Sequence, residues 1–231
     1  GLTETLGPIS VNLDWRNKVG TVGPPVCGGR ARVSADGEIE VRGMSVFSHY
    51  HNNPAADAEA FTPDGWFRTG DIGSIDSDGW IRITGRKKEL IVTAGGKNVA
   101  PAILEDRLRG HPLISQVLVI GDGEPFISAL ITLDREMLPG WLHNHGLPEM
   151  GVVEASTNPQ VLAALDRAVA RTNRAVSRAE SIRTYRVLTN DFTEANGLLT
   201  PSLKVKRNQV MKEYADTIAD IYASTRKGPQ E

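Results

Sequence analysis

Short apolar runs, interrupted by glycine, proline and aspartate, characterise the first part of the chain. Residues 38–42 (Glu-Ile-Glu-Val-Arg) alternate charged and apolar side chains, which predicts a half-buried strand that ends at Gly43. The sequence Asp-Ser-Asp-Gly at residues 76–79 predicts a hairpin turn, because Asp and Gly tolerate a positive φ. Further strand candidates lie at residues 67–69, 72–75 and 80–84. We therefore expect a small β meander or barrel here.

The pattern changes at Lys88, where longer apolar segments and helical periods appear. Two strongly apolar strands are expected at residues 116–120 and 126–131, and the Gly-Asp-Gly between them predicts antiparallel pairing. Shorter strands are expected at residues 89–92 and 183–188. Helices are expected at residues 101–109, 136–145, 160–176 and 207–224, the last with Val210, Tyr214, Ile218 and Tyr222 at i, i+4 steps.

These patterns predict an α+β fold in two parts. Residues 1–87 are β-rich and read as the barrel-like end of a domain rather than a whole domain. Residues 88–231 read as a compact α+β unit. The N-terminal residues lack a Met and show no signal-peptide pattern, so we interpret the chain as a fragment of a longer protein.

Composition and charge exclude several classes of protein. The net charge of −2 provides no general attraction to nucleic acid or to anionic membranes. No apolar run approaches the roughly 18 residues that a membrane-spanning helix needs. Cys27 is the only cysteine, so an internal disulfide is impossible and a reducing compartment is expected. We expect Cys27 itself to be a small buried apolar residue rather than a nucleophile.

Two segments near the change of pattern carry candidate chemistry. Asp71 is flanked by glycines at a strand end, where its carboxylate could accept two hydrogen bonds from neighbouring ribose hydroxyls. The alternative is an Asp that stabilises its own turn. Arg86 lies in a basic corner, Gly-Arg-Lys-Lys, and provides donors that match a phosphate or ribose edge. A solvated corner is the alternative, but a position beside a domain boundary favours a hinge next to a ligand site.

Two loops in the second part are further candidates. The sequence Gly95-Gly96-Lys97-Asn98 precedes a helix, and its glycines allow a ligand to approach the backbone N–H groups; a plain strand-to-helix turn is the alternative. Residues 197–207 form a basic loop in which Lys204 could follow a phosphate through a reaction; a solvated loop is the alternative. No aromatic residues interleave with this loop, so we expect no nucleic-acid interface.

One histidine pair invites a metal interpretation. His143 and His145 lie two residues apart, so on a helix they face different sides. No Cys or carboxylate stands at ligand spacing from them, and we expect no metal site there.

Taken together, these segments resemble the C-terminal portion of the adenylate-forming enzymes, the superfamily of acyl-CoA synthetases, peptide-synthetase adenylation domains and luciferases. Residues 65–73 match the family's Trp-x-x-Thr-Gly-Asp motif, and residues 83–88 match its interdomain hinge motif. Residues 1–5 look like the end of its Tyr-Gly-x-Thr-Glu motif. Residues 95–99 match the loop that faces the CoA thiol, and residues 200–204 resemble the final Thr-Pro-Ser-Gly-Lys motif.

The resemblance implies a role for each motif. In the nucleotide site, Thr3 touches a phosphate, Glu4 holds Mg²⁺, Asp71 binds the ribose hydroxyls and Arg86 contacts the nucleotide. Lys88 is the pivot of the hinge between residues 1–87, the end of the large N-terminal AMP-binding domain, and residues 88–231, a mobile α+β lid domain. The residues of the loop facing CoA are Gly95, Gly96, Lys97 and Asn98. Lys204, which matches by its offset from Pro201 better than Lys206 does, takes the place of the adenylation lysine.

The resemblance also implies a subfamily and an activity. Leu203 stands where many members have Gly, and this variant is similar to that of long-chain acyl-CoA synthetases, including bacterial ones. The long insert between Leu133 and Tyr185 is similar to theirs as well. The implied enzyme is an AMP-forming fatty acid–CoA ligase that uses ATP, Mg²⁺ and CoA. We expect it in the cytoplasm, with peripheral contact to the inner face of the membrane left open.

Alternative functions remain at this stage. A fatty acyl-AMP ligase would pass the acyl group to a carrier protein, and a stand-alone, non-catalytic nucleotide-binding module would do neither step. The phosphate loop, adenine pocket and fatty-acid tunnel of the family precede Gly1, so the partner of this chain would be the missing N-terminal part of the same protein. We expect the chain alone to be inactive.

Overall fold

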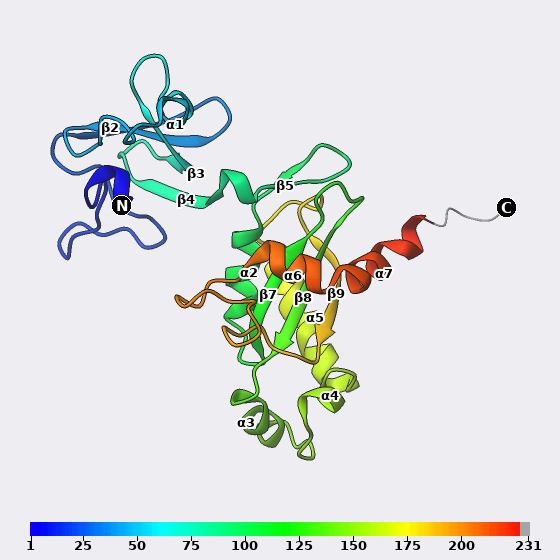
Figure 1. Cartoon of the computed structure of the whole chain (residues 1–231). Helices are drawn as coiled ribbons and strands as arrows, with labels where there is room; N and C mark the ends of the chain where they lie inside the picture. Colours follow the sequence, from blue (N-terminus) through cyan, green and yellow to red (C-terminus); the bar gives the residue numbers. More distant parts are fainter. Residues whose placement is uncertain (227–231) are drawn as a thin grey trace. The chain divides into compact units, whose positions relative to one another are not determined.

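The structure is a computed structural model that describes residues 1–226, and it confirms the mixed α+β fold (Figure 1). The chain folds into two compact units that divide between Leu90 and Ile91. None of the helices in the described residues combines the length and the apolar content that crossing a membrane would take.

The first unit is built on a four-stranded antiparallel sheet with the strand order β1-β2-β3-β4, which is a meander. Its strands are β1 (Gly29–Val33), β2 (Glu38–Gly43), β3 (Phe67–Ile75) and β4 (Ile81–Arg86). Helix α1 (Pro54–Ala60) and the short 3₁₀ helices η1 (Thr3–Thr5) and η2 (Lys87–Glu89) complete the unit. Sequence patterns did not indicate β1 or α1.

The hairpin between β3 and β4 forms as the sequence predicted. Gly79 has a φ of +82° in the turn, and the N–H of Asp76 donates to the carbonyl of Trp80. The two runs expected at residues 67–69 and 72–75 are one continuous strand with a register shift between Ile72 and Gly73. A Cβ at Gly73 would collide with the carbonyl oxygen of Arg82, so only glycine fits where the strands come this close.

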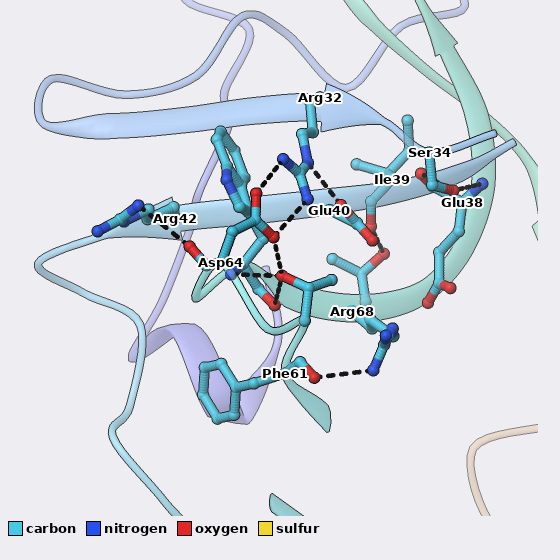
Figure 2. A network of polar contacts seen from close by, with 12 residues as sticks. Arg32, Ser34, Glu38, Ile39, Glu40, Arg42, Phe61, Asp64 and Arg68 are labelled. Carbon is cyan, nitrogen blue, oxygen red and sulfur yellow. Dashed lines mark hydrogen bonds and ion pairs between the residues drawn. The ribbon is translucent and has the colours of Figure 1, made fainter. Parts of the chain in front are cut away.

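The alternation in β2 did not predict which side chains are buried. Glu38 and Glu40 were expected on a solvent face, but both are buried together with Ile39 and Val41. Strand pairing places Arg32 opposite Glu40, and its Nε lies 2.6 Å from a Glu40 carboxylate oxygen (Figure 2). A buried carboxylate is tolerated when a cation and hydrogen bonds replace its water, and here a neighbouring strand provides them.

The second unit contains a three-stranded sheet with the order β7-β8-β9. Strands β7 (Ile114–Ile120) and β8 (Ile127–Leu133) pair antiparallel, as predicted, whereas β9 (Ile182–Leu188) pairs parallel to β8. The chain crosses from β8 to β9 through α3 (Met137–Asn144), α4 (Val152–Ala155) and α5 (Pro159–Asn173). The remaining elements are β5 (Ile91–Val92), β6 (Asn98–Val99), α2 (Pro101–Arg109), α6 (Arg207–Glu213) and α7 (Ala215–Arg226).

Helices cover both faces of this sheet, which explains why every residue of β8 is buried. On one face, Val117 and Val119 pack in a core with residues of α2, α3 and α5. On the other face, Leu118 and Ile120 pack with Val210, Ile221 and Tyr222 of α6 and α7. Successive strand residues alternate between the two cores because their side chains point to opposite faces.

Two further expectations were wrong. The last helix is two helices, α6 and α7, which break at Tyr214, whose N–H still donates to the carbonyl of Val210. The predicted apolar face nevertheless holds, since Val210 and Tyr222 are buried in one cluster. Cys27 is exposed rather than buried, because it lies in a surface turn in which the N–H of Gly29 donates to the carbonyl of Val26.

Candidate functional site

Strand pairing brings Asp71 and Arg86 together in the first unit. The two residues are directly opposite each other on β3 and β4, and Arg86 Nη1 lies 3.0 Å from Asp71 Oδ1. The Asp71 side chain is 21% exposed and that of Arg86 is 50% exposed. Gly70 adopts a φ of +72° immediately before Asp71. A carboxylate and a guanidinium predicted from separate motifs therefore form one polar pair.

The electrostatic setting of Asp71 suits a carboxylate that accepts hydrogen bonds. Burial raises its pKa above the ordinary value, and the positive charge of Arg86 opposes that rise. Part of the hydration shell of the carboxylate is already removed, so hydroxyl donors from a ligand would restore hydrogen bonds that the fold has taken away. The pair can therefore bind a polar group that carries neighbouring hydroxyls.

A cavity of about 840 Å³ lies in the first unit next to this pair. It is lined by Glu4, Arg86 and Lys88 from the sequence-predicted set, together with Gly70 and the missed residue Tyr50. The hydroxyl of Tyr50 donates to Glu4 Oε1 at 3.0 Å. Asp71 and Thr3 are not among the lining residues, and Thr3 is exposed on η1. A volume of this size accommodates a drug-sized ligand rather than a single ion.

Sequence reasoning also missed Glu38. Its side chain is only 4% exposed, and its carboxylate accepts from the N–H of Gly70 and from Lys87 Nζ, both at 2.8 Å. Glu38 thus holds Gly70, the residue before Asp71, and Lys87, the residue before Lys88, against β2. The only signal in the sequence was a charge at an alternating strand position, which ordinarily indicates solvent.

The sequence Gly95-Gly96-Lys97-Asn98 forms an exposed turn between β5 and β6 of the second unit. Gly96 has a φ of +75°, and its N–H donates to the carbonyl of Thr93, so this N–H is used by the turn. Within residues 1–226 the N–H of Gly95 has no hydrogen-bond partner. Lys97 Nζ lies 3.5 Å from Glu180. The turn offers one backbone donor rather than two.

Lys204 lies at the exposed end of a loop in the second unit that is closed by hydrogen bonds between its own residues. The N–H of Thr200 donates to the carbonyl of Lys204 at 2.8 Å, and the N–H of Lys204 donates to Thr200 Oγ1 at 3.1 Å. Neither Lys204 nor Lys206 has an ion-pair partner in the part of the chain that the structure describes. The ammonium group of Lys204 is therefore free to contact a ligand.

Leu203 occupies a backbone conformation that ordinarily favours glycine. Its φ is +59°, in the left-handed region, and its side chain is exposed. A non-glycine residue there carries a strain of roughly 1–2 kcal/mol. Glycine would adopt this φ without that strain, because it has no Cβ.

Substitutions of Leu203 are expected to separate backbone strain from side-chain function. Leu203→Gly should leave the unfolding midpoint unchanged or raised, since relief of strain offsets the greater chain entropy of glycine. Leu203→Val should lower the unfolding free energy by about 1 kcal/mol, because a β-branched residue fits a positive φ poorly. Chemical denaturation of the chain measures both. Equal stability of the valine and glycine variants would contradict a strained loop.

Comparison with known proteins defines the class. A model of the AMP-binding enzyme C-terminal domain matches residues 88–226. The chain therefore belongs to the AMP-binding enzyme family through this domain.

Individual relatives agree with the family. The chain is 54% identical over 223 residues to the long-chain-fatty-acid–CoA ligase FadD15 of Mycobacterium bovis, covering 96% of this chain and 37% of that protein. It therefore spans little more than a third of the length of this relative.

Solved structures share the fold. Apo MatB from Rhodopseudomonas palustris is 28% identical, with a TM-score of 0.59 over 94% of this chain and 40% of that one. The O-succinylbenzoate coenzyme A synthetase MenE of Bacillus subtilis, in complex with ATP and magnesium ion, is 24% identical, with a TM-score of 0.65 over 90% of this chain and 40% of that one.

Proposed function

We propose that this chain is the C-terminal portion of a long-chain fatty acid–CoA ligase that forms AMP. The observation that carries the proposal is its 54% identity to FadD15 over 96% of the chain. In the first step, the fatty acid carboxylate attacks the α-phosphate of ATP and pyrophosphate leaves, which gives an acyl-adenylate. In the second step, the CoA thiol attacks the acyl carbonyl, loses its proton and displaces AMP.

The polar pair in the first unit would hold the nucleotide. We assign the ribose hydroxyls to Asp71, whose carboxylate is partly desolvated and lies 3.0 Å from Arg86. Arg86 lines the cavity and would contact the nucleotide, while Thr3 would contact a phosphate. A paired carboxylate and guanidinium support this assignment because they match the hydroxyls and the anionic groups of one nucleotide.

Glu4 fits a role in holding Mg²⁺ together with substrate phosphates. Its carboxylate lines the cavity and accepts one hydrogen bond, from Tyr50, which leaves further oxygen lone pairs available. Residues 1–226 contain no cluster of three or more potential ligands that could hold a metal without substrate. This donor set fits Mg²⁺, which is commonly bound by one or two carboxylates plus substrate phosphates and waters. The ion would neutralise charge on those phosphates.

The second unit would contribute one loop to each step. Lys204 would stabilise the negative charge that develops on the carboxylate and phosphate oxygens during adenylation. The turn containing Gly95, Gly96, Lys97 and Asn98 would face the CoA thiol in the second step. We propose residues 1–87 and 88–231 as the functional domains, with Lys88 as the pivot about which the lid domain changes its position between steps.

We also propose a cytoplasmic location for the complete enzyme, with the inner face of the membrane as a source of fatty acid. Long-chain fatty acids partition into lipid, because each buried CH₂ group favours transfer from water by about 0.8 kcal/mol. The other two substrates, ATP and CoA, would be drawn from solution.

The full-length protein, incubated with a long-chain fatty acid, Mg²⁺-ATP and CoA, tests this function. We expect pyrophosphate and AMP to be released in equal amounts and acyl-CoA to accumulate, as followed by mass spectrometry. Omitting CoA should leave acyl-adenylate on the enzyme. Acyl-adenylate that is transferred to a carrier protein but not to CoA would identify a fatty acyl-AMP ligase instead. Absence of acyl-adenylate under all conditions would refute the proposal.

A further inference from the structure

Strand β7 lies at the edge of the three-stranded sheet, so half of its backbone groups cannot pair with another strand. Val119 is a residue of β7 whose N–H and carbonyl both point away from β8. Its side chain is buried in the core shared with α2 and α5. Unpaired backbone groups at such a buried position would be destabilising, and side chains must supply their partners.

Glu105 and Arg207 supply these partners. The N–H of Val119 donates to Glu105 Oε1 at 2.8 Å, and Arg207 Nη2 donates to the carbonyl of Val119 at 2.6 Å. Arg207 Nη1 also lies 2.6 Å from the same Glu105 oxygen. The side chain of Glu105 is 11% exposed and that of Arg207 is 19% exposed, so the pair is largely shielded from water. Together they imitate a neighbouring strand along one residue of the sheet edge.

This ion pair connects the sheet to both loops of the proposed site. Glu105 is on α2, the helix that follows the turn at residues 95–98, and Arg207 is the first residue of α6, three positions after Lys204. The loop itself is bonded internally, through Thr200 and Lys204 and through the N–H of Lys206, which donates to the carbonyl of Leu198. The N–H of Leu199 donates to the nearby carbonyl of Thr193, and the Leu199 side chain is buried in the core beside β7. Within the described residues, Arg207 makes the polar contacts of residues 199–207 with segments far away in the sequence.

The turn at residues 95–98 is held by contacts of its own. The N–H of Ala94 donates to the carbonyl of Glu124, and the N–H of Val92 donates to the carboxylate of Asp122. Loss of the Glu105–Arg207 pair would therefore affect the two loops unequally, because the long-range polar contacts of the Lys204 loop come from Arg207 and those of the turn do not.

We propose that Glu105 and Arg207 are positioning residues that fix the Lys204 loop against the edge of the sheet for adenylation. The inference rests on the proposed function of Lys204. The two-pronged geometry of Arg207 matters. A guanidinium can donate to a carboxylate and to a carbonyl at once in a fixed plane, whereas a lysine ammonium is a flexible point charge.

Arg207→Lys in the full-length enzyme tests this inference. We expect acyl-adenylate formation to fall by about 10- to 100-fold, since a misplacement of about 1 Å can cost on the order of 100-fold in rate. Thioester formation from supplied acyl-adenylate should keep its wild-type rate. The matched control is Leu165→Ala in α5, a fully buried core residue away from the loop. It should lower the melting temperature but leave the ratio of the two rates unchanged.

A second measurement does not depend on activity. Amide hydrogen exchange at residues 203–206 should become faster in Arg207→Lys than in Leu165→Ala. Unchanged exchange, or equal losses in both half-reactions, would overturn the inference while leaving the proposed function intact. If the wild-type enzyme forms no acyl-adenylate, the proposed function fails, and the inferred role in adenylation fails with it. The hydrogen-exchange data would then show only whether Arg207 holds the loop against the sheet.

Discussion

Lys204→Ala in the full-length enzyme is expected to lower the rate of acyl-adenylate formation by about 10²–10³, the usual cost of removing one donor that stabilises transition-state charge. Lys204 is exposed, lies on a loop that is closed by its own hydrogen bonds and has no ion-pair partner among residues 1–226. Its loss should therefore leave folding intact and remove only the charge that the reaction uses. Exchange of labelled pyrophosphate into ATP measures this step.

The same variant should form thioester from supplied acyl-adenylate at the wild-type rate, because Lys204 would have no role in the second step. Lys206→Ala is the matched control. The side chain of Lys206 is also exposed, has no ion-pair partner among the described residues and lies only two residues away. It should retain the first step. Equal losses in the two half-reactions, or a larger effect of Lys206→Ala, would show that the assignment to Lys204 is wrong.

Lys88→Pro is expected to slow the second half-reaction by on the order of tenfold while affecting the first much less. Lys88 lies in η2, and a proline there would fix φ near −65° and restrict the residue before it. If the lid domain must change position about this backbone between the steps, a fixed torsion should hinder the state that forms the thioester. Single-turnover thioester formation from supplied acyl-adenylate measures the effect.

Lys88→Ala separates backbone freedom from side-chain charge. Alanine removes the ammonium group but leaves φ free, so it should retain the second step. The thermal unfolding of both variants should also be measured. Lys87 forms ion pairs with Asp36 and Glu38, and a proline at residue 88 could disturb them. A proline variant that is as stable as wild type and performs the second step normally would argue against a pivot at this residue.

The predictable parts of this protein were those that depend on local sequence. The Asp-Ser-Asp-Gly hairpin and the apolar strands β7 and β8 follow from turn chemistry and from runs of apolar residues, and both were confirmed. The break between α6 and α7 was not predictable, since the i, i+4 pattern of Val210 and Tyr222 continues across it. The parallel pairing of β9 with β8 depends on a long crossover, which strand patterns alone do not encode.

The candidate site shows the same division. The Asp71 and Lys204 segments could be proposed as candidates from their residues, because each lies in a short motif. The positive φ of Leu203 could not be recognised, since leucine rarely adopts it and only the folded loop requires it.

The sequence by itself determined most of the strands, helices and turns, although not β1, α1 or the break between α6 and α7. It also marked the segments that carry candidate chemistry, because these depend on residues that are close along the chain. Only the tertiary structure decided which carboxylates are buried and which cations pair with them: Glu38 with Lys87, Glu40 with Arg32, and Glu105 with Arg207. The reason is energetic. A charged side chain can leave water only where partners compensate its lost hydration, and in all three cases folding brings those partners from another part of the chain.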